Sequence, residues 1–148
     1  MDEKEQKVHR DIAKYGWHAV SVFEKGEAPD FQYSIGFQRT FNHPEILIFG
    51  LEVDVMHGML DRIAHGLRAG QRFDVGIAAA DILVGYSCLF RPIPKNRFRD
   101  YFGWALWYYA DESFAALQCI WPDLSGRFPW DPDASDEVRR REPILHPG

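Results

Sequence analysis

The segment from residue 31 to residue 51 constrains the fold most, because it contains two strand patterns separated only by a polar loop. From Phe31 to Phe37 large apolar side chains alternate with Gln, Ser and Gly, which is the two-residue period of a strand. Residues 45–51 (EILIFGL) form a short, continuous run with β-branched residues, typical of a central strand. Two strands this close in the chain predict a sheet, with residues 38–44 as the loop between them.

Helical spacing recurs in three other places. The segments are residues 2–15, residues 53–69, and residues from about 95 onward with a break at Gly103. In the first two, apolar side chains return every three or four residues, and a glycine follows the last turn, where its left-handed conformation can end a helix. We therefore expect about three helices.

Further strands are predicted on both sides of this segment. They are residues 17–24, 82–92 and 114–121, each with alternating apolar side chains or a short apolar run. The first is the hairpin partner of Phe31–Phe37, and residues 73–80 are ambiguous. From residue 122 to the end, five prolines favour an irregular tail that wraps the domain and is docked by Phe128 and Trp130.

Composition limits the number of domains and the class of fold. The 148 residues fit one domain, and 46% hydrophobic residues with five Trp, six Tyr and eleven Phe exceed what a disordered chain contains. We expect one domain over residues 1–148, divided into an N-terminal helix (1–15), a sheet and helix core (16–122) and a wrapping tail with a frayed end (123–148). The predicted class is α+β, with a mainly antiparallel sheet that is curled or forms a split barrel.

Charge and targeting signals exclude several partners. The formal charge of −5 opposes binding to phosphate backbones, and the short basic runs at residues 97–99 and 139–141 are typical of a solvated surface. The first residues lack the zones of a secretory signal, and no apolar run approaches the roughly 18 residues of a membrane span. Two cysteines far apart make no disulfide framework. We expect a cytoplasmic protein that binds neither nucleic acid nor membrane.

Three short motifs carry a resemblance to a known family. They are YSIG at residues 33–36, HPE at 43–45 and GRFPW at 126–130, in that order. With the segments around them they resemble the bacterial family named domain of unknown function 4262, over nearly all of residues 16–132. The resemblance implies a small, single-domain bacterial protein of the cytoplasm and assigns no catalytic residue. The order of elements is also similar to small split barrels of the flavin-reductase type, an analogy of fold alone.

The loop between the two central strands contains the most reactive group of side chains. Pro44 fixes its own φ and extends His43, so His43 lies at the mouth of the strand that Glu45 begins. His43 and Glu45 could form half of a metal site or an acid–base pair. In the structural alternative, which we favour, His43 bonds a backbone carbonyl and Glu45 pairs with Arg39.

The helix at residues 53–69 has its own polar stripe. His57, Asp61 and His65 are spaced four residues apart and fall on one side of the helix. Two His and one Asp can bind Zn²⁺, but no fourth ligand is apparent and the stripe drifts from the apolar face toward solvent. We interpret it as a solvated helix surface and predict no metal site.

Most cysteine and aromatic side chains are predicted to pack in the core, and a few side chains are left that could contact a ligand. Cys88 and Cys119 share strand faces with large apolar residues, which predicts two buried, unreactive thiols. The segment from Phe98 to Tyr109 has seven aromatic rings, more than one buried face requires, so some should border a cleft or an interface. Arg91 ends a strand next to a proline, where it could hold an anion or pair with Asp100.

These observations define one candidate binding site and two hypotheses of function. The candidate ligand-binding residues are Tyr33, Ser34, Arg39, His43, Glu45, Arg91, Trp104 and Tyr108. The first hypothesis is a small-ligand binding protein with an aromatic-lined site, whose cofactor, reaction and enzymatic character are left open. The second is a non-catalytic interaction module, for example a homodimer, with the aromatic surplus and the tail as its interface.

Overall fold

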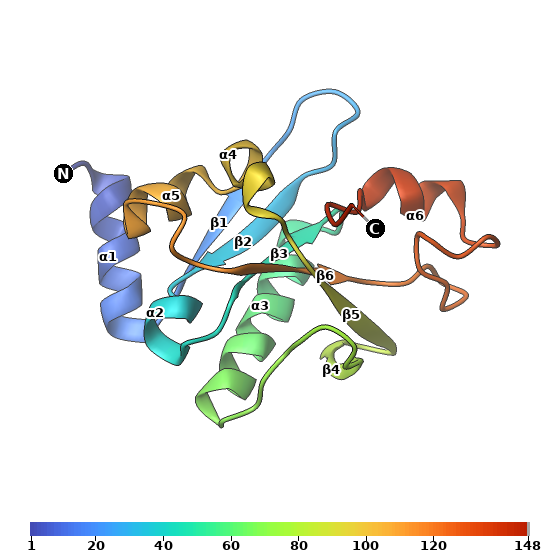
Figure 1. Ribbon diagram of the computed structural model, residues 1–148, viewed down its shortest axis with the longest axis horizontal. Helices are drawn as coiled ribbons and strands as arrows, with labels where there is room; N and C mark the ends of the chain where they lie inside the picture. Colours follow the sequence, from blue (N-terminus) through green and yellow to red (C-terminus); the bar gives the residue numbers. More distant parts are fainter. Residues whose placement is uncertain (148) are drawn as a thin grey trace.

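The computed structural model describes residues 1–147 and contains one six-stranded sheet in the order β1-β2-β3-β6-β5-β4 (Figure 1). The strands are β1 (His18–Val22), β2 (Phe31–Ile35), β3 (Glu45–Phe49), β4 (Ala79–Leu83), β5 (Tyr86–Pro92) and β6 (Ala116–Ile120). Neighbouring strands are antiparallel except β3 and β6, which are parallel. The predicted α+β class and mostly antiparallel sheet are confirmed, but the sheet is mixed and does not close into a barrel.

Six α-helices lie within residues 1–147, twice the number predicted. They are α1 (Glu3–Tyr15), α2 (Phe37–Phe41), α3 (Val53–Arg68), α4 (Phe98–Tyr101), α5 (Gly103–Tyr109) and α6 (Asp136–Arg141), and a 3-10 turn, η1 (Lys95–Arg97), precedes α4. The two long helices α1 and α3 were predicted, as was the break at Gly103 that separates α4 from α5. Helices α2 and α6 were not predicted.

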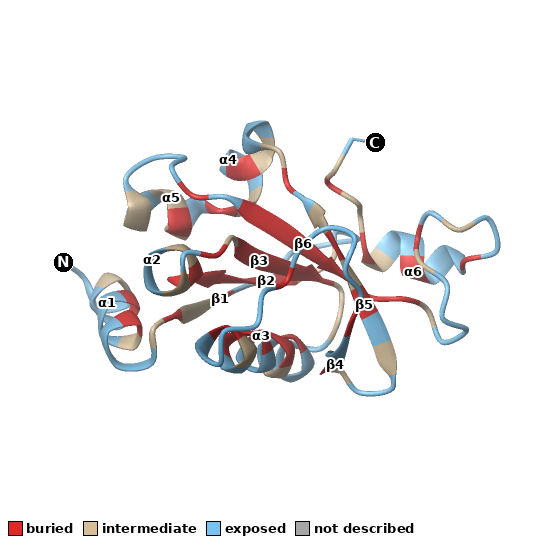
Figure 2. Ribbon diagram, turned by 60° about the horizontal axis from the view of Figure 1, so that its bottom comes forward, coloured by how far each residue is buried: buried red, intermediate tan, exposed pale blue. Residues whose placement is uncertain are grey.

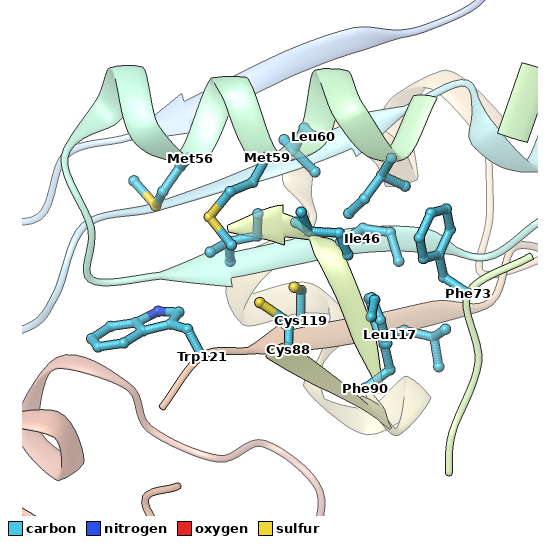
Figure 3. Close-up of a cluster of buried hydrophobic side chains, with 14 of the residues drawn as sticks. Ile46, Met56, Met59, Leu60, Phe73, Cys88, Phe90, Leu117, Cys119 and Trp121 are labelled. Atoms are coloured by element: carbon cyan, nitrogen blue, oxygen red, sulfur yellow. The ribbon is translucent and has the colours of Figure 1, made fainter. Parts of the chain in front are cut away.

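Helix α3 covers one face of the sheet. Its residues Met56, Met59 and Leu60 are buried in a cluster that also contains Ile46 and Ile48 of β3. Figure 3 shows this cluster, with the sulfur atoms of the two cysteines between α3 and the strands β5 and β6. The prediction that both thiols are buried is confirmed.

Helices α4 and α5 lie over the opposite face of the sheet (Figure 2), and together with α1 they contribute to a second apolar cluster. Val8 and Ile12 of α1 and Ala105 of α5 are buried there with Tyr33 and Ile35 of β2. Because β2 and β3 lie between the two clusters, every residue of both strands is buried. Burial on both faces is also the reason that residues 46–49 form an uninterrupted apolar run.

The strand predicted over residues 82–92 is correct for residues 86–92, which form β5, but the chain turns at residues 84 and 85, so the segment is not one strand. Strand β4 ends at Leu83, β5 begins at Tyr86, and these two residues are register partners in an antiparallel hairpin. The turn residue Gly85 has a φ of 86°, a conformation that glycine adopts without strain. A two-residue turn preserves the alternation of side chains, so one long strand and a hairpin have the same apolar pattern.

The tail also differs from the prediction. Prolines 132 and 143 leave ten residues free of proline between them, and α6 forms in this interval. Ser135 caps it, because its hydroxyl oxygen accepts a hydrogen bond of 3.1 Å from the amide of Val138. Phe128 and Trp130 stack with ring centroids 5.2 Å apart, and Trp130 remains 37% exposed.

Within residues 1–147 no helix combines the length and the apolar character that crossing a bilayer requires.

Candidate functional site

Glu45, the first residue of β3, is fully buried and accepts hydrogen bonds from five donors. The hydroxyl of Ser34 donates at 2.8 Å, and the hydroxyl of Tyr109 donates from α5. Three successive backbone amides at the start of α2, those of residues 36, 37 and 38, donate at 3.1, 3.1 and 3.2 Å. Both carboxylate oxygens are therefore engaged by groups of the same chain.

This network explains why α2 forms where a loop was predicted. The carboxylate of Glu45 satisfies the amides at the helix start, which the short helix cannot pair internally. Gly36 precedes α2 with a φ of 119°, in contact with the backbone of Gly16 and Trp17. Burial raises the pKa of Glu45 above its ordinary value, although the hydrogen bonds from Tyr109 and Ser34 act in the opposite direction.

Four of the predicted site residues hold α5 near the sheet. The hydroxyl of Tyr33 accepts a hydrogen bond of 3.0 Å from the amide of Trp104, the second residue of α5. Arg39 donates to the hydroxyl of Tyr108 at 2.9 Å, so the expected pairing of Arg39 with Glu45 is wrong. Arg39 lies on α2, whose amides already occupy the carboxylate of Glu45.

His43 lies apart from these residues. Its Nδ1 is 2.8 Å from the carbonyl oxygen of Pro44, and its Nε2 is 2.9 Å from the carbonyl oxygen of Phe73. Burial lowers the pKa of His43, although both carbonyl groups act in the opposite direction. The structural interpretation of His43, a bond to a backbone carbonyl, is confirmed.

Arg91 is also separate from the Glu45 network. It lies on β5, and its guanidinium carbon is 3.8 Å from the ring centroid of Trp130 in the tail. The expected partner Asp100 instead lies 4.0 Å from Arg97. The cation–π contact joins the tail to the sheet.

Two adjoining cavities lie along β1, between α1, α3 and α5. The first, which we call the histidine cleft, has a volume of about 390 Å³ and lies between α1, β1 and α3. The second, the tryptophan cleft, has about 210 Å³ and is bordered by α1, β1 and Trp104. They share Lys7, His18 and Ala19, so we treat them as one feature, the β1 groove. Figure 1 shows β1 at the edge of the sheet, with α1 beside it.

The β1 groove is locally basic in an acidic protein. Lys4, Lys7 and Arg68 line it together with the imidazoles of residues 18, 57 and 65, against the two carboxylates of residues 11 and 61. The whole chain has a formal charge of −5. The charge of the groove is therefore opposite in sign to the net charge of the chain.

Aromatic side chains border both ends of the groove. Trp17 is buried at the wall of the histidine cleft, and its ring stacks on the imidazole of His57 with centroids 5.7 Å apart and planes inclined by 28°. Trp104 lines the other cleft. Arg68 donates to the carbonyl oxygen of Tyr15, so its position between α3 and the end of α1 is fixed.

A carboxylate and an imidazole are paired in the centre of the groove. Nδ1 of His18 lies 2.7 Å from Oδ2 of Asp11, and Lys7 donates to the same oxygen at 2.9 Å. Burial alone would raise the pKa of Asp11, but the hydrogen bonds from Lys7 and His18 outweigh it and hold the pKa below its ordinary value. Asp11 is therefore ionised at neutral pH.

The helical stripe of residues 57, 61 and 65 borders the histidine cleft, although all three residues are exposed. The prediction of a polar, solvent-facing side of α3 is confirmed, but that side also forms one wall of a cavity. Within residues 1–147 no group of three or more His, Cys, Asp or Glu side chains is arranged to hold a metal ion.

Sequence reasoning did not identify several residues of these two regions. Tyr109 was counted only among the surplus rings of its segment, and Asp11 and His18 were assigned to a helix and a strand without a role. The sequence did contain a signal for the pair of Asp11 and His18, since a glycine turn between a helix and a strand brings the residues near that turn together. No local signal relates Tyr109 to Glu45.

Comparison with known proteins gives one match. The family model described as Domain of unknown function (DUF4262) matches residues 11–135, well over half of the chain. The resemblance suggested by the three motifs is thereby confirmed. Comparisons with curated proteins and with solved structures gave no significant match. The chain belongs to this family of domains of unknown function.

Proposed function

We propose that this member of the DUF4262 family binds a small anionic ligand with a flat ring in the β1 groove. The observation that carries the proposal is the gathering of three cations and three imidazoles, against the two carboxylates of Asp11 and Asp61, around the β1 groove of an acidic protein. Attraction between these groups and a carboxylate or phosphate would concentrate the ligand there.

The size and the walls of the groove support the same function. About 390 Å³ in the histidine cleft falls within the roughly 300–1,000 Å³ of small-molecule sites. Trp17 and Trp104 offer ring edges and faces for a flat ligand. A carboxylate or phosphate group can then reach Lys7, which lines both clefts.

The proposal changes the role of the predicted site residues. Trp104 stays as a residue that contacts the ligand, and Tyr33, Arg39 and Tyr108 hold the helix that carries it. Ser34 and Glu45 stabilise the start of α2. The remaining two, His43 and Arg91, lie outside the proposed groove.

Titration calorimetry with 4-hydroxybenzoate and with inorganic phosphate tests the proposal. We expect saturable binding of the aromatic anion, weakened about three- to tenfold by Lys7→Gln through the loss of one charge-assisted hydrogen bond. Lys14→Gln, on the same helix but outside the groove, is the matched control and should bind as the wild type does. Equal affinity in the two variants, or no saturable binding of either anion, contradicts the proposal.

A second candidate function, an interaction module, is supported by one observation. At the far end of the sheet Leu124 is 91% exposed and Val84 is 81% exposed. Leu124 also borders a cavity of about 460 Å³ with Leu83, Tyr86 and Trp121. Light scattering at increasing concentration tests self-association, and a constant monomer mass contradicts the homodimer form of this function.

A further inference from the structure

We propose that the β1 groove is a catalytic site, in which His18 acts as a general base and Asp11 is the positioning residue that orients it. The inference rests on the proposed function, since it requires a ligand in the groove. The substrate class that fits is a small aryl ester with an anionic group. The reaction is hydrolysis of that ester.

The tautomer of His18 follows from its contact with Asp11. Asp11 is ionised and can only accept hydrogen bonds, so the proton of the 2.7 Å contact belongs to Nδ1 of His18. Nε2 of the neutral ring then carries a lone pair and no proton. A ring in this tautomer can take a proton from a bound molecule, as the histidine of a Ser-His-Asp triad does.

The pair of Asp11 and His18 is surrounded mostly by protein. The side chain of His18 is 13% exposed and that of Asp11 is 19% exposed, so the contact is largely shielded from water. Shielding strengthens the attraction between the carboxylate and the imidazolium that forms after proton uptake. Lys7 donates to the same carboxylate oxygen, which fixes Asp11 from a second direction.

His18 lies where the two clefts of the groove adjoin. His18 lines both clefts, so it borders the space that a ligand in either one would occupy. Within residues 1–147 no hydrogen bond to Nε2 of His18 accompanies the one that Nδ1 makes. Nε2 is thus the atom that remains for a bound molecule.

These groups permit one balanced sequence of steps. Nε2 of His18 takes a proton from water as the water oxygen bonds to the ester carbonyl carbon, and Asp11 stabilises the imidazolium. The cations of Lys7 and Arg68 attract the charge of the carbonyl oxygen in the tetrahedral intermediate. When the bond to the phenol oxygen breaks, the imidazolium returns the proton to that oxygen. One aryl ester and one water give one carboxylic acid and one phenol.

The experiment uses 4-acetoxybenzoate as the anionic ester and phenyl acetate as its neutral counterpart. The full-length protein should hydrolyse the anionic ester at least tenfold faster than His18→Gln does, within the roughly 10²–10⁴-fold range of general base catalysis. Phenyl acetate should be hydrolysed more slowly, because it lacks the carboxylate that the basic groups attract. His9→Gln, on the exposed surface of α1 and outside the groove, should keep the wild-type rate.

Asp11→Asn separates positioning from folding. An asparagine can donate as well as accept, so it no longer specifies the Nδ1–H tautomer. We expect kcat to fall at least tenfold with little change in KM, and the ¹⁵N shifts of the His18 ring to move from the Nδ1–H form toward a mixture. Unchanged ring shifts in Asp11→Asn overturn the role of Asp11, whatever the melting temperature of the variant.

Binding of 4-hydroxybenzoate, the unreactive product, distinguishes the two proposals. If the product binds and the wild type hydrolyses 4-acetoxybenzoate no faster than His18→Gln, catalysis is overturned and ligand binding stands. If the product does not bind and there is no hydrolysis, both are overturned. Hydrolysis that depends on His18 and Asp11 supports both.

Discussion

The hydroxyl of Tyr109 donates a hydrogen bond to the carboxylate of Glu45, which lies 64 residues earlier in the chain. The bond connects the end of α5 to the first residue of β3, and through the same carboxylate to the start of α2. Three elements from distant parts of the chain therefore meet at one buried carboxyl group.

Replacing Tyr109 by phenylalanine removes one donor of this network. We expect Tyr109→Phe to lower the free energy of unfolding by about 1–3 kcal/mol, because a buried acceptor loses a partner. The neighbouring variant Tyr108→Phe loses only a hydroxyl bonded to the exposed Arg39 and should cost less than about 1 kcal/mol. Urea denaturation of both variants measures the difference, and equal losses would contradict the importance of the Glu45 network.

Glu142 gives a prediction about pH. It is buried, its Oε1 accepts from the amide of Trp121 at 2.7 Å, and its Oε2 has no hydrogen-bond partner in the structure. Burial raises the pKa of Glu142 to about 10. Between pH 4.5 and about pH 10 the carboxyl group of Glu142 therefore stays protonated in the folded protein. In the unfolded chain, where its pKa is the ordinary 4.5, the same group has released its proton.

The contribution of Glu142 to the free energy of unfolding is fully present below pH 4.5. It is lost as the pH rises toward 10, by at most about 1.4 kcal/mol per pH unit. Glu142→Gln cannot titrate, so its stability should fall less between pH 5 and pH 8 than that of the wild type. Urea denaturation at several pH values measures both slopes. Parallel curves for the two proteins would show that Glu142 does not titrate in this way.

The contact of Arg91 with Trp130 predicts a moderate coupling. Trp130 is 37% exposed, so Trp130→Ala should cost about 1–2 kcal/mol, less than the 3–5 kcal/mol typical of a fully buried ring. A double-mutant cycle with Arg91→Ala should give a coupling of about 0.5–1 kcal/mol for the cation–π pair. A coupling of zero would assign the loss to contacts with Phe128 instead.

Two glycines with positive φ separate crowding from backbone strain. A Cβ on Gly36 would lie 2.6 Å from the carbonyl oxygen of Gly16, whereas a Cβ on Gly70 would have no heavy atom within 4 Å. We expect Gly70→Ala to cost about 1 kcal/mol from strain alone, and Gly36→Ala to cost clearly more. Thermal unfolding compares them, and similar melting temperatures would mean that the contact at Gly36 relaxes without cost.

The elements with a strong local period could be predicted from the sequence. Helix α3 was expected over residues 53–69 and spans Val53–Arg68, because its buried side chains recur at helical spacing. The hairpin at Gly85 could not be separated from one long strand, since a two-residue turn preserves the alternation. The apolar pattern also could not predict that β3 pairs with β6, because a period of apolar residues identifies a strand but not the strand beside it.

The candidate site was harder to predict than the fold. The sequence predicted one site formed by a strand and an aromatic helix. Hydrogen bonds do connect β2 and α2 with α5, through Tyr33, Arg39 and Tyr108. Glu45 was expected to pair with Arg39, but the hydroxyls of Ser34 and Tyr109 and three backbone amides satisfy it, and backbone amides leave no trace in a sequence. The pair of Asp11 and His18 depends on how α1 turns into β1, which a period of apolar residues does not describe.

The position of β6 has a consequence for the order of folding. This strand comes last in the chain, yet it lies between β3 and β5 and hydrogen-bonds to both. During synthesis β1, β2 and β3 can pair with one another, and β4 with β5, before residue 116 exists. Until β6 inserts, the edges of β3 and β5 are open to strands of other chains, which is the condition that leads to aggregation. We therefore expect the insertion of β6 between β3 and β5, which requires long-range pairing, to be the slow step of folding.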